Sequence, residues 1–330
     1  MKCFLLFCLV GTSLALNKVQ LGGLKKLLKN LDSGVFPTCQ LVLFSEMVDY
    51  DTAEKNCQNF DIGMGDAQKG HLATVNDDGK NSDLKLLLQM AYPYKGKSQK
   101  WAADHWVWAG LRKTKNNDGS KKSKKYNAED WSWAADGSSP KEFHKWMKHQ
   151  PDQRTDKKNG VKYLQNQMRI NHQGIWDDTF KYKTHPYACD YQGKYIISAS
   201  SETWSQAKAS CEAAGLELAK VRSDAEVKEI IKSADYFLGS KADGLKLWDK
   251  ENWIWLGGTD EEEEGEWKWV DGSPIEYYKN MNWRNPNPDN AEYIKNQAQH
   301  YLAISRDGQF DDSFDHRSRH RAFACQCPGT

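Results

Sequence analysis

One series of tryptophans, cysteines and acidic triplets occurs twice along this chain of 330 residues. In the first copy the landmarks are Cys57, Trp108, Trp133, Trp146, Gln150-Pro151-Asp152, Trp176-Asp177-Asp178 and Cys189. In the second they are Cys211, Trp255, Trp269, Trp283, Asn287-Pro288-Asp289, Phe310-Asp311-Asp312 and Cys325. Both the order and the main spacings are kept. A repeat this long predicts two copies of one whole domain rather than the units of a solenoid.

The N-terminus has the form of a secretory signal peptide, which we assign to residues 1–15. Lys2 precedes an apolar run at residues 4–10, and the small residues Ser13 and Ala15 mark a cleavage site. No other apolar stretch approaches 18 residues, so we expect a secreted, extracellular chain with no transmembrane segment. Its length fits two domains.

Removal of that peptide leaves six cysteines, at positions 39, 57, 189, 211, 325 and 327. An even number in an oxidising compartment predicts three disulfides, with 15 possible connectivities. No cysteine or histidine cluster has zinc spacing, because the pair His316 and His320 lacks an intervening glutamate.

Charge is distributed unevenly between the copies. Residues 39–189 contain 24 Lys and Arg against 19 Asp and Glu, whereas residues 190–330 contain 17 against 25. A basic run at residues 121–125 and an acidic run at residues 261–264 stand out. They are either solvated loops, or charges that orient the domains or steer a polyanionic partner such as a sulfated glycan. A nucleic-acid partner is not expected for an exported chain with an acidic half.

Residues 16–38 form an N-terminal amphipathic segment, with leucines at helical spacing that Gly34 and Pro37 end. Such a helix packs on a neighbour, self-associates or binds a membrane. Further helices are expected near residues 51–57, 83–90, 203–211 and 224–231, the last with Asp224 as its N-cap. Strands are expected at residues 72–75 and 218–221.

Each copy resembles the C-type lectin-like domain, on the ordered set of landmarks quoted above. The resemblance covers residues 39–327 and implies an α+β fold with two tandem domains, at residues 39–190 and 191–328. Each domain is then expected to have two helices, small antiparallel sheets and a long loop region. The buried core should include Trp108, Trp133, Trp255 and Trp269.

The resemblance also implies Ca²⁺ in at least one domain, bound beside a cis X-Pro bond. Calcium takes oxygen ligands, and the matching positions offer them. The candidate metal ligands are Gln150, Asp152, Asp177, Asp178, Asn287, Asp289, Gln299, Asp311 and Asp312. The candidate sugar-binding residues are Gln150, Asp152, Asp177, Asn287, Asp289 and Asp311.

Departures from the family pattern bear on this site. Val161 stands where the first domain would carry a further acidic ligand, so calcium should prefer the second domain. The Gln-Pro-Asp triplet implies a galactose-type sugar for the first domain. The opposing interpretation is a retained loop scaffold whose acids are solvated and bind no calcium.

The family's second disulfide is replaced by an aromatic pair in both copies. Tyr163 and Phe180 take its place in the first domain, and Tyr301 and Phe314 in the second. We expect Cys57 to pair with Cys189 and Cys211 with Cys325. Because the family's domain ends lie side by side, Cys39 should pair with Cys327; the rival is an intermolecular bond through Cys39.

These observations favour a secreted carbohydrate-binding protein, calcium-dependent, that recognises microbial or self glycans as in innate immunity. The alternative is a structural or interaction protein of an extracellular or mineralised matrix, which would bind matrix protein through vestigial sugar sites. No nucleophile–base arrangement or catalytic carboxylate pair is recognisable, so an enzyme is not expected.

Overall fold

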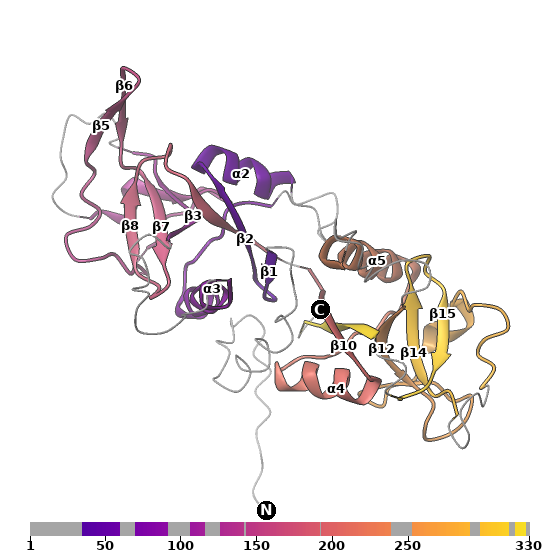
Figure 1. The fold of residues 1–330 in the computed structure, drawn as a ribbon. Helices are drawn as coiled ribbons and strands as arrows, with labels where there is room; N and C mark the ends of the chain where they lie inside the picture. The colour runs from indigo at the N-terminus through magenta and orange to yellow at the C-terminus, as the bar shows by residue number, and fades with distance from the viewer. Residues whose placement is uncertain are drawn as a thin grey trace, which may run out of the picture.

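The computed structural model describes residues 35–59, 70–91, 106–115, 126–141, 143–191, 193–238, 253–290, 298–316 and 321–327. Two lobes lie side by side (Figure 1), the first lobe within residues 35–191 and the second lobe within residues 193–327. No helix in these ranges is long and apolar enough to cross a membrane. The expected signal peptide, residues 16–34, the basic run at 121–125 and His320 lie outside the described residues.

The first lobe contains a seven-stranded sheet in the order β1-β2-β9-β3-β7-β8, with β4 paired to β3. Its strands are β1 (Val35–Pro37), β2 (Leu41–Val48), β3 (Trp106–Lys113), β4 (Trp131–Trp133), β7 (Gln167–Asn171), β8 (Trp176–Thr179) and β9 (His185–Asp190). The helices are α2 (Tyr50–Asn59) and α3 (Asp78–Ala91), with a 3-10 turn at Ala128–Asp130. A separate hairpin of β5 (Thr155–Lys158) and β6 (Val161–Leu164) projects from the far end of the lobe (Figure 1).

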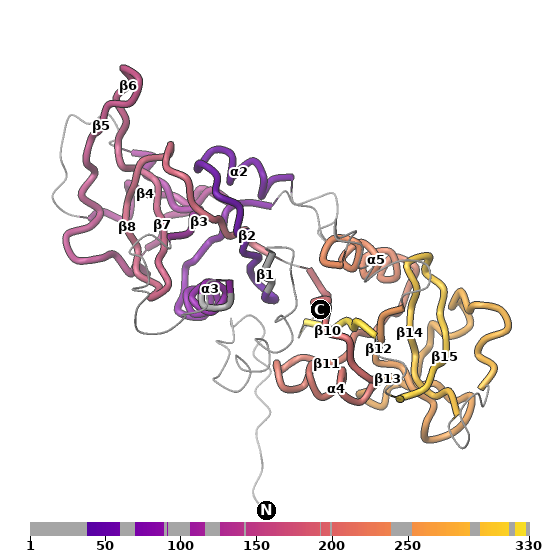
Figure 2. Tube along the Cα trace, in the orientation of Figure 1, coloured from indigo at the N-terminus to yellow at the C-terminus, as the bar shows by residue number. Residues whose placement is uncertain are grey.

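The second lobe contains a seven-stranded sheet in the order β10-β16-β12-β14-β15, with β11 paired to β16 and β13 to β12. Its strands are β10 (Tyr195–Glu202), β11 (Glu217–Leu218), β12 (Trp253–Thr259), β13 (Lys268–Trp269), β14 (Tyr301–Ser305), β15 (Phe310–Ser313) and β16 (Arg321–Gln326). The helices are α4 (Trp204–Ala213) and α5 (Asp224–Leu238), with a 3-10 turn at Glu276–Asn280. Figure 2 shows the short strands β11 and β13 beside α4.

The two lobes share one strand arrangement. In each, the first long strand pairs antiparallel with the last, β2 with β9 and β10 with β16. In each, the last strand also pairs parallel with the central one, β3 or β12. The mixed α+β class expected from the sequence is therefore confirmed.

A buried glycine marks the same point of both central strands. The amide of Gly110 donates to the carbonyl of Ala73, and that of Gly257 to the carbonyl of Ala219, each at 2.9 Å. A methyl group on Gly110 would lie 2.5 Å from the Leu72 carbonyl oxygen, so no larger residue fits this close approach. Gly110 and Gly257 therefore provide a common origin for comparing the lobes residue by residue.

The tryptophans of the repeat fill the core, as expected. Trp108, Trp133, Trp255 and Trp269 are at most 3% exposed. Trp108 Nε1 donates to the carbonyl of Val48, and Trp255 Nε1 donates to the carbonyl of Glu202, each at 2.9 Å. Each indole thus buries its ring without leaving its N–H unpaired.

Three disulfides hold the lobes, in the pairings that we expect from the sequence. Cys57–Cys189 and Cys211–Cys325 each join the first helix of a lobe to its last strand, with Cα separations of 5.5 and 5.6 Å. Cys39–Cys327 joins the beginning of the first lobe to the end of the second, with a Cα separation of 5.7 Å.

The junction between the lobes is short and packed. Tyr191 is 3% exposed, and its hydroxyl donates to the Tyr195 carbonyl at 2.8 Å. Buried side chains of the first lobe, among them Phe44 and Tyr187, belong to one apolar cluster with the core of the second lobe. A further apolar cluster lies wholly within the first lobe.

Several element boundaries differ from the sequence predictions. Helix α3 begins at Asp78 rather than residue 83, and α5 continues to Leu238. Ser223, not Asp224, caps α5, because its hydroxyl oxygen accepts the N–H of Glu226 at 3.3 Å. Of the strand expected at residues 72–75, only an isolated bridge forms, between Leu72 and Cys189 of β9. Of the strand expected at residues 218–221, only β11 forms, paired with β16. Both short segments thus direct their backbone hydrogen bonds to the last strand of the sheet. Residues 35–37, expected to end a helix, extend the first sheet as β1.

Candidate functional site

The loop before residue 290 of the second lobe runs beside β15. The Asn287–Pro288 peptide bond is cis, as the resemblance implies. The amide of Arg284 donates to the carbonyl of Phe310 at 2.9 Å, which places the Asn-Pro-Asp triplet against Asp311 and Asp312. The side-chain amide of Asn287 donates to Asp311. Four predicted site residues are thus gathered in one place by strand β15 and the loop.

Asp312 is the buried centre of this group. One carboxylate oxygen, Oδ2, accepts the backbone N–H groups of Asp289 at 3.1 Å and Asn290 at 2.9 Å. The other oxygen, Oδ1, is buried and has no hydrogen-bond partner among the described residues. The pKa of this carboxyl is raised to about 6, chiefly by burial and in smaller part by the charges of Asp311 and Asp289. An unpaired buried carboxylate oxygen in this setting fits a cation better than it fits a dry core.

Asn290 connects Asp312 to a second acidic group, which sequence reasoning missed. Asp260, Glu264 and His300 bring one ligand atom each within 4.8 Å of one another. His300 Nδ1 lies 3.0 Å from Asp260 and 3.6 Å from Glu264. The side chain of Asn290 donates to Glu264 at 2.5 Å and accepts the N–H of Gln299 at 3.0 Å.

A signal for this group was present in the sequence. Asp260 directly follows β12, and Glu264 ends the acidic run at residues 261–264, which is also compatible with a solvated loop. Gln299, a predicted ligand, is 7% exposed, and its Oε1 is buried without a hydrogen-bond partner among the described residues. The second lobe therefore offers oxygen ligands from three chain segments.

The matching loop of the first lobe has the same backbone pattern. The Gln150–Pro151 bond is cis. Asp178 Oδ1 accepts the N–H of Asp152 at 3.1 Å and Oδ2 that of Gln153 at 2.8 Å, whereas Asp312 accepts both equivalent bonds on Oδ2. Asp178 is fully buried, and burial raises the pKa of its carboxyl to about 7.

Arginines occupy the remaining carboxylates of this loop. Arg169 donates to Asp177 Oδ2 twice, from Nε at 3.0 Å and from a terminal nitrogen at 2.7 Å. Arg154 Nε lies 2.6 Å from Asp152 Oδ2, although Asp152 Oδ1 is buried without a partner. A guanidinium that already neutralises Asp177 competes with a metal ion for that carboxylate. Val161 is 52% exposed on β6 and offers no ligand.

A buried lysine stands where the second lobe has Asp260. Lys113 lies three residues after Gly110, and Asp260 lies three residues after Gly257, so the two positions correspond. The Lys113 ammonium lies 2.5 Å from Gln153 Oε1 and 3.8 Å from Asp130, and its side chain is 2% exposed. The first lobe thus places a positive side chain where the second places negative ones. These pairs oppose calcium in the first lobe more strongly than Arg321, which lies 3.5 Å from Asp311, opposes it in the second.

Part of the second lobe matches a known protein family. Residues 200–323 match the model of the lectin C-type domain. These residues form a lectin C-type domain. Salivary C-type lectin 2 of Aedes albopictus is 32% identical over 108 residues, which are 32% of this chain and 63% of that protein. C-type lectin domain family 4 member F of Rattus norvegicus is 31% identical over 104 residues, 30% of this chain and 16% of the relative.

The chain spans less than two thirds of the length of these two relatives. Among solved structures, the mouse scavenger receptor C-type lectin carbohydrate-recognition domain is similar, with 29% sequence identity and a TM-score of 0.31. The match covers 40% of this chain and 86% of that chain.

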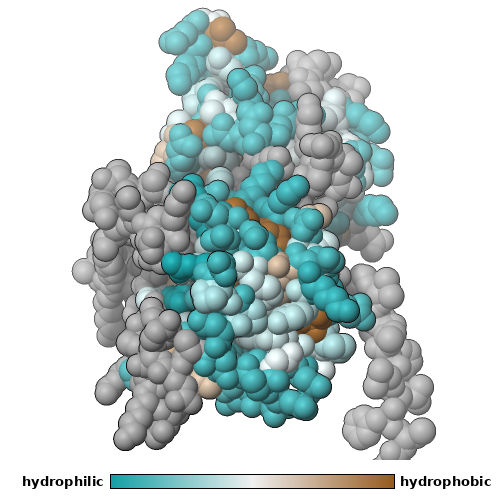
Figure 3. Space-filling model, turned by 90° about the vertical axis from the view of Figure 1, so that its right-hand side faces the viewer, coloured by the Kyte–Doolittle hydropathy of each residue, from teal (hydrophilic) through white to brown (hydrophobic). Residues whose placement is uncertain are grey.

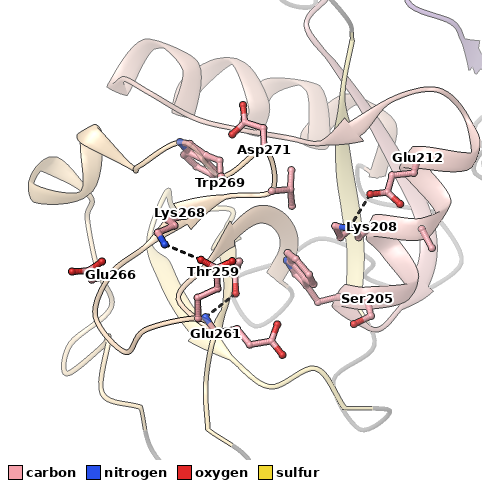
Figure 4. Close-up of a pocket in the computed structure, with 14 residues that line it drawn as sticks. Ser205, Lys208, Glu212, Thr259, Glu261, Glu266, Lys268, Trp269 and Asp271 are labelled. Carbon is pink, nitrogen blue, oxygen red and sulfur yellow. Dashed lines mark hydrogen bonds and ion pairs between the residues drawn. The ribbon is translucent and has the colours of Figure 1, made fainter. Parts of the chain in front are cut away.

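A groove of about 620 Å³ lies elsewhere on the lectin domain, between α4 and the segment that follows β12 (Figure 4). Its two lysines are paired with neighbouring acids, Lys208 with Glu212 at 2.9 Å and Lys268 with Glu262 at 2.8 Å. None of the predicted ligands lines it. Seen from the right-hand side of Figure 1, the described surface is mostly hydrophilic, with small separate apolar spots (Figure 3).

The aromatic replacements of the second disulfide do not meet as simple pairs. Tyr163 and Phe180 both contact a third ring, that of Tyr182, at centroid distances of 4.9 and 5.4 Å. In the lectin domain Tyr301 packs on Trp204 at 4.6 Å, and Phe314 is 1% exposed. Tyr163 and Phe180 are therefore linked through a third ring, whereas Tyr301 packs on Trp204.

Proposed function

We propose that the lectin domain binds carbohydrate through a calcium ion held by its loop region. The observation that carries this proposal is Asp312, a buried carboxylate with one oxygen left unpaired beside two further acids. A bound cation would satisfy that oxygen and favour the ionised form of the group.

The ligands that we propose are those expected from the sequence together with the newly found group. They are Asn287, Asp289, Gln299, Asp311 and Asp312, with Asp260, Glu264 and His300 as an adjoining acidic group. Sugar hydroxyls would complete the shell of the ion, with Asn287, Asp289 and Asp311 beside them. When bound, calcium would supply a Lewis-acidic point for the sugar oxygens.

For the first lobe we propose a domain of the same fold, at residues 39–190, that binds no calcium. Its strand order and its shared glycine support the fold, and the arginine and lysine pairs of its loop oppose calcium. The galactose-type sugar expected from Gln150-Pro151-Asp152 has no support, because such recognition would need calcium at that triplet.

We also propose that the chain is exported, since three disulfides favour an oxidising compartment. The matrix alternative has no observation in its favour.

Calorimetric titration with calcium, followed by a glycan array with and without chelator, tests the proposal. Asp312→Ala should abolish calcium binding, whereas Asp178→Ala should leave it unchanged. Glycan binding should disappear in chelator and in Asp312→Ala alone. Retention of calcium binding by Asp312→Ala, or its loss in Asp178→Ala, would contradict the proposed ligand set.

A further inference from the structure

The β5–β6 hairpin of the first lobe is a short two-stranded projection with a tight turn. Asn159 and Gly160 form its two-residue loop, both with positive φ, at 52° and 78°. This is the turn that matches the twist of a hairpin. The hairpin points away from the second lobe (Figure 1).

Two lysines lie directly opposite each other on this hairpin. Lys157 pairs with Lys162 across the strands, so their side chains share one face with Cβ atoms about 5 Å apart. Both are exposed, and neither forms an ion pair within the described part of the chain. Like charges placed directly opposite destabilise a strand pair. The hairpin thus holds an unfavourable charge pair that its own packing does not explain.

The other face of the hairpin is anchored to the lobe. The hydroxyl of Tyr182 donates to Asp156 at 2.5 Å, and the Lys158 ammonium lies 4.4 Å from the Tyr182 ring centre. Tyr163 meets the same ring edge-on. Residues 154–164 carry four basic side chains against one acidic, and Tyr182 already engages that single acid. The face with Lys157 and Lys162 is therefore positive and free.

We propose that this face binds the sulfate groups of a sulfated polysaccharide directly, without calcium. An ammonium is a compact charge without a fixed fork, so two of them suit neighbouring anionic groups along a flexible chain. The tip of the hairpin, residues 157–162, has a single apolar side chain, Val161, which argues against insertion into a bilayer. The site lies apart from the proposed calcium site, so the two proposals stand or fall separately.

Binding of the full chain to immobilised dextran sulfate, with unsulfated dextran as the reference, tests this proposal in chelator. The double variant Lys157→Gln/Lys162→Gln should bind dextran sulfate about 25-fold more weakly, since each lysine near an anionic surface contributes a factor of about five and the two factors multiply. The salt dependence should become shallower by about two released ions. A matched variant, Lys55→Gln/Lys85→Gln, removes two exposed charges from the helices of the same lobe and should change binding less than twofold.

Replacement of both hairpin lysines by arginine should retain binding, because the charges remain. The glutamine variant should melt no lower than the parent, since a like-charge pair is removed; if it does melt lower, Lys162→Gln alone replaces it. The proposal is wrong if dextran sulfate is not bound, if binding requires calcium, or if the hairpin and helix variants lose affinity equally. Equal loss of binding to phosphatidylserine vesicles would also overturn it, in favour of a membrane surface.

Discussion

Replacing Asp312 with asparagine separates the cost of a buried carboxylate from its use as a calcium ligand. The side chain is 1% exposed, and burial raises the pKa of the carboxyl from 3.8 to about 6. The folded protein therefore holds this proton more tightly than the unfolded chain. The stability that the group contributes is complete below the unfolded pKa and is lost as pH rises through about 6. A rise of about two units corresponds to about 3 kcal/mol at neutral pH.

Without calcium, Asp312→Asn should raise the free energy of unfolding at pH 7.5 by about 2 kcal/mol, which recovers most of the cost of ionising the buried carboxyl. The amide oxygen keeps the two backbone hydrogen bonds and carries no charge to bury. The gain should shrink at pH 4, where the carboxyl is protonated in the folded protein. With calcium at one hundred times its dissociation constant, the parent protein should gain about 2.7 kcal/mol and the variant should not.

Urea unfolding at both pH values, with calcium or with chelator, measures these differences. Asp178→Asn is the control, because Asp178 is as buried and has a pKa raised to about 7, although each of its two oxygens accepts one backbone N–H. Its amide oxygen keeps only one of those bonds, so this variant should stabilise the protein less than Asp312→Asn in chelator at pH 7.5, and it should leave the calcium gain intact. An undiminished calcium gain in Asp312→Asn, or a loss of that gain in Asp178→Asn, would refute the reasoning.

Three further outcomes are expected. Replacing Cys39 and Cys327 by serine should lower the free energy of unfolding by about 3–5 kcal/mol, because the disulfide closes a loop of 288 residues. Urea unfolding measures this loss. A covalent dimer of the parent protein on a non-reducing gel would contradict the bridge. Arg169→Met should cost about 3 kcal/mol by leaving Asp177 buried and unpaired, and adding Asp177→Asn should recover part of it in a double-mutant cycle. Gly110→Ala should destabilise by at least about 2 kcal/mol, because its methyl group would meet the Leu72 carbonyl at 2.5 Å; an unchanged melting temperature would show that the strands separate freely.

Much of the fold could be predicted because its signals are local or repeated. Large indoles at matching positions, such as Trp108 and Trp255, are buried wherever a core exists, and both are fully buried here. Helix boundaries were less certain: α3 begins five residues early because Asp77 accepts the N–H of Lys80 and so caps the helix before the apolar positions start. Such caps depend on one side-chain rotamer and leave little trace in periodicity.

The candidate site divides in the same way. The sequence alone determined which residue types recur in the two loops, and therefore that Asp178 and Asp312 would occupy equivalent places. Only the tertiary structure decided which basic side chains lie against these acids. Arg169 reaches Asp177 from the neighbouring strand, and Lys113 reaches Gln153 across 40 residues. Ion pairing depends on distances between side chains that chain order does not specify, because Coulomb energy and desolvation change over a few ångströms.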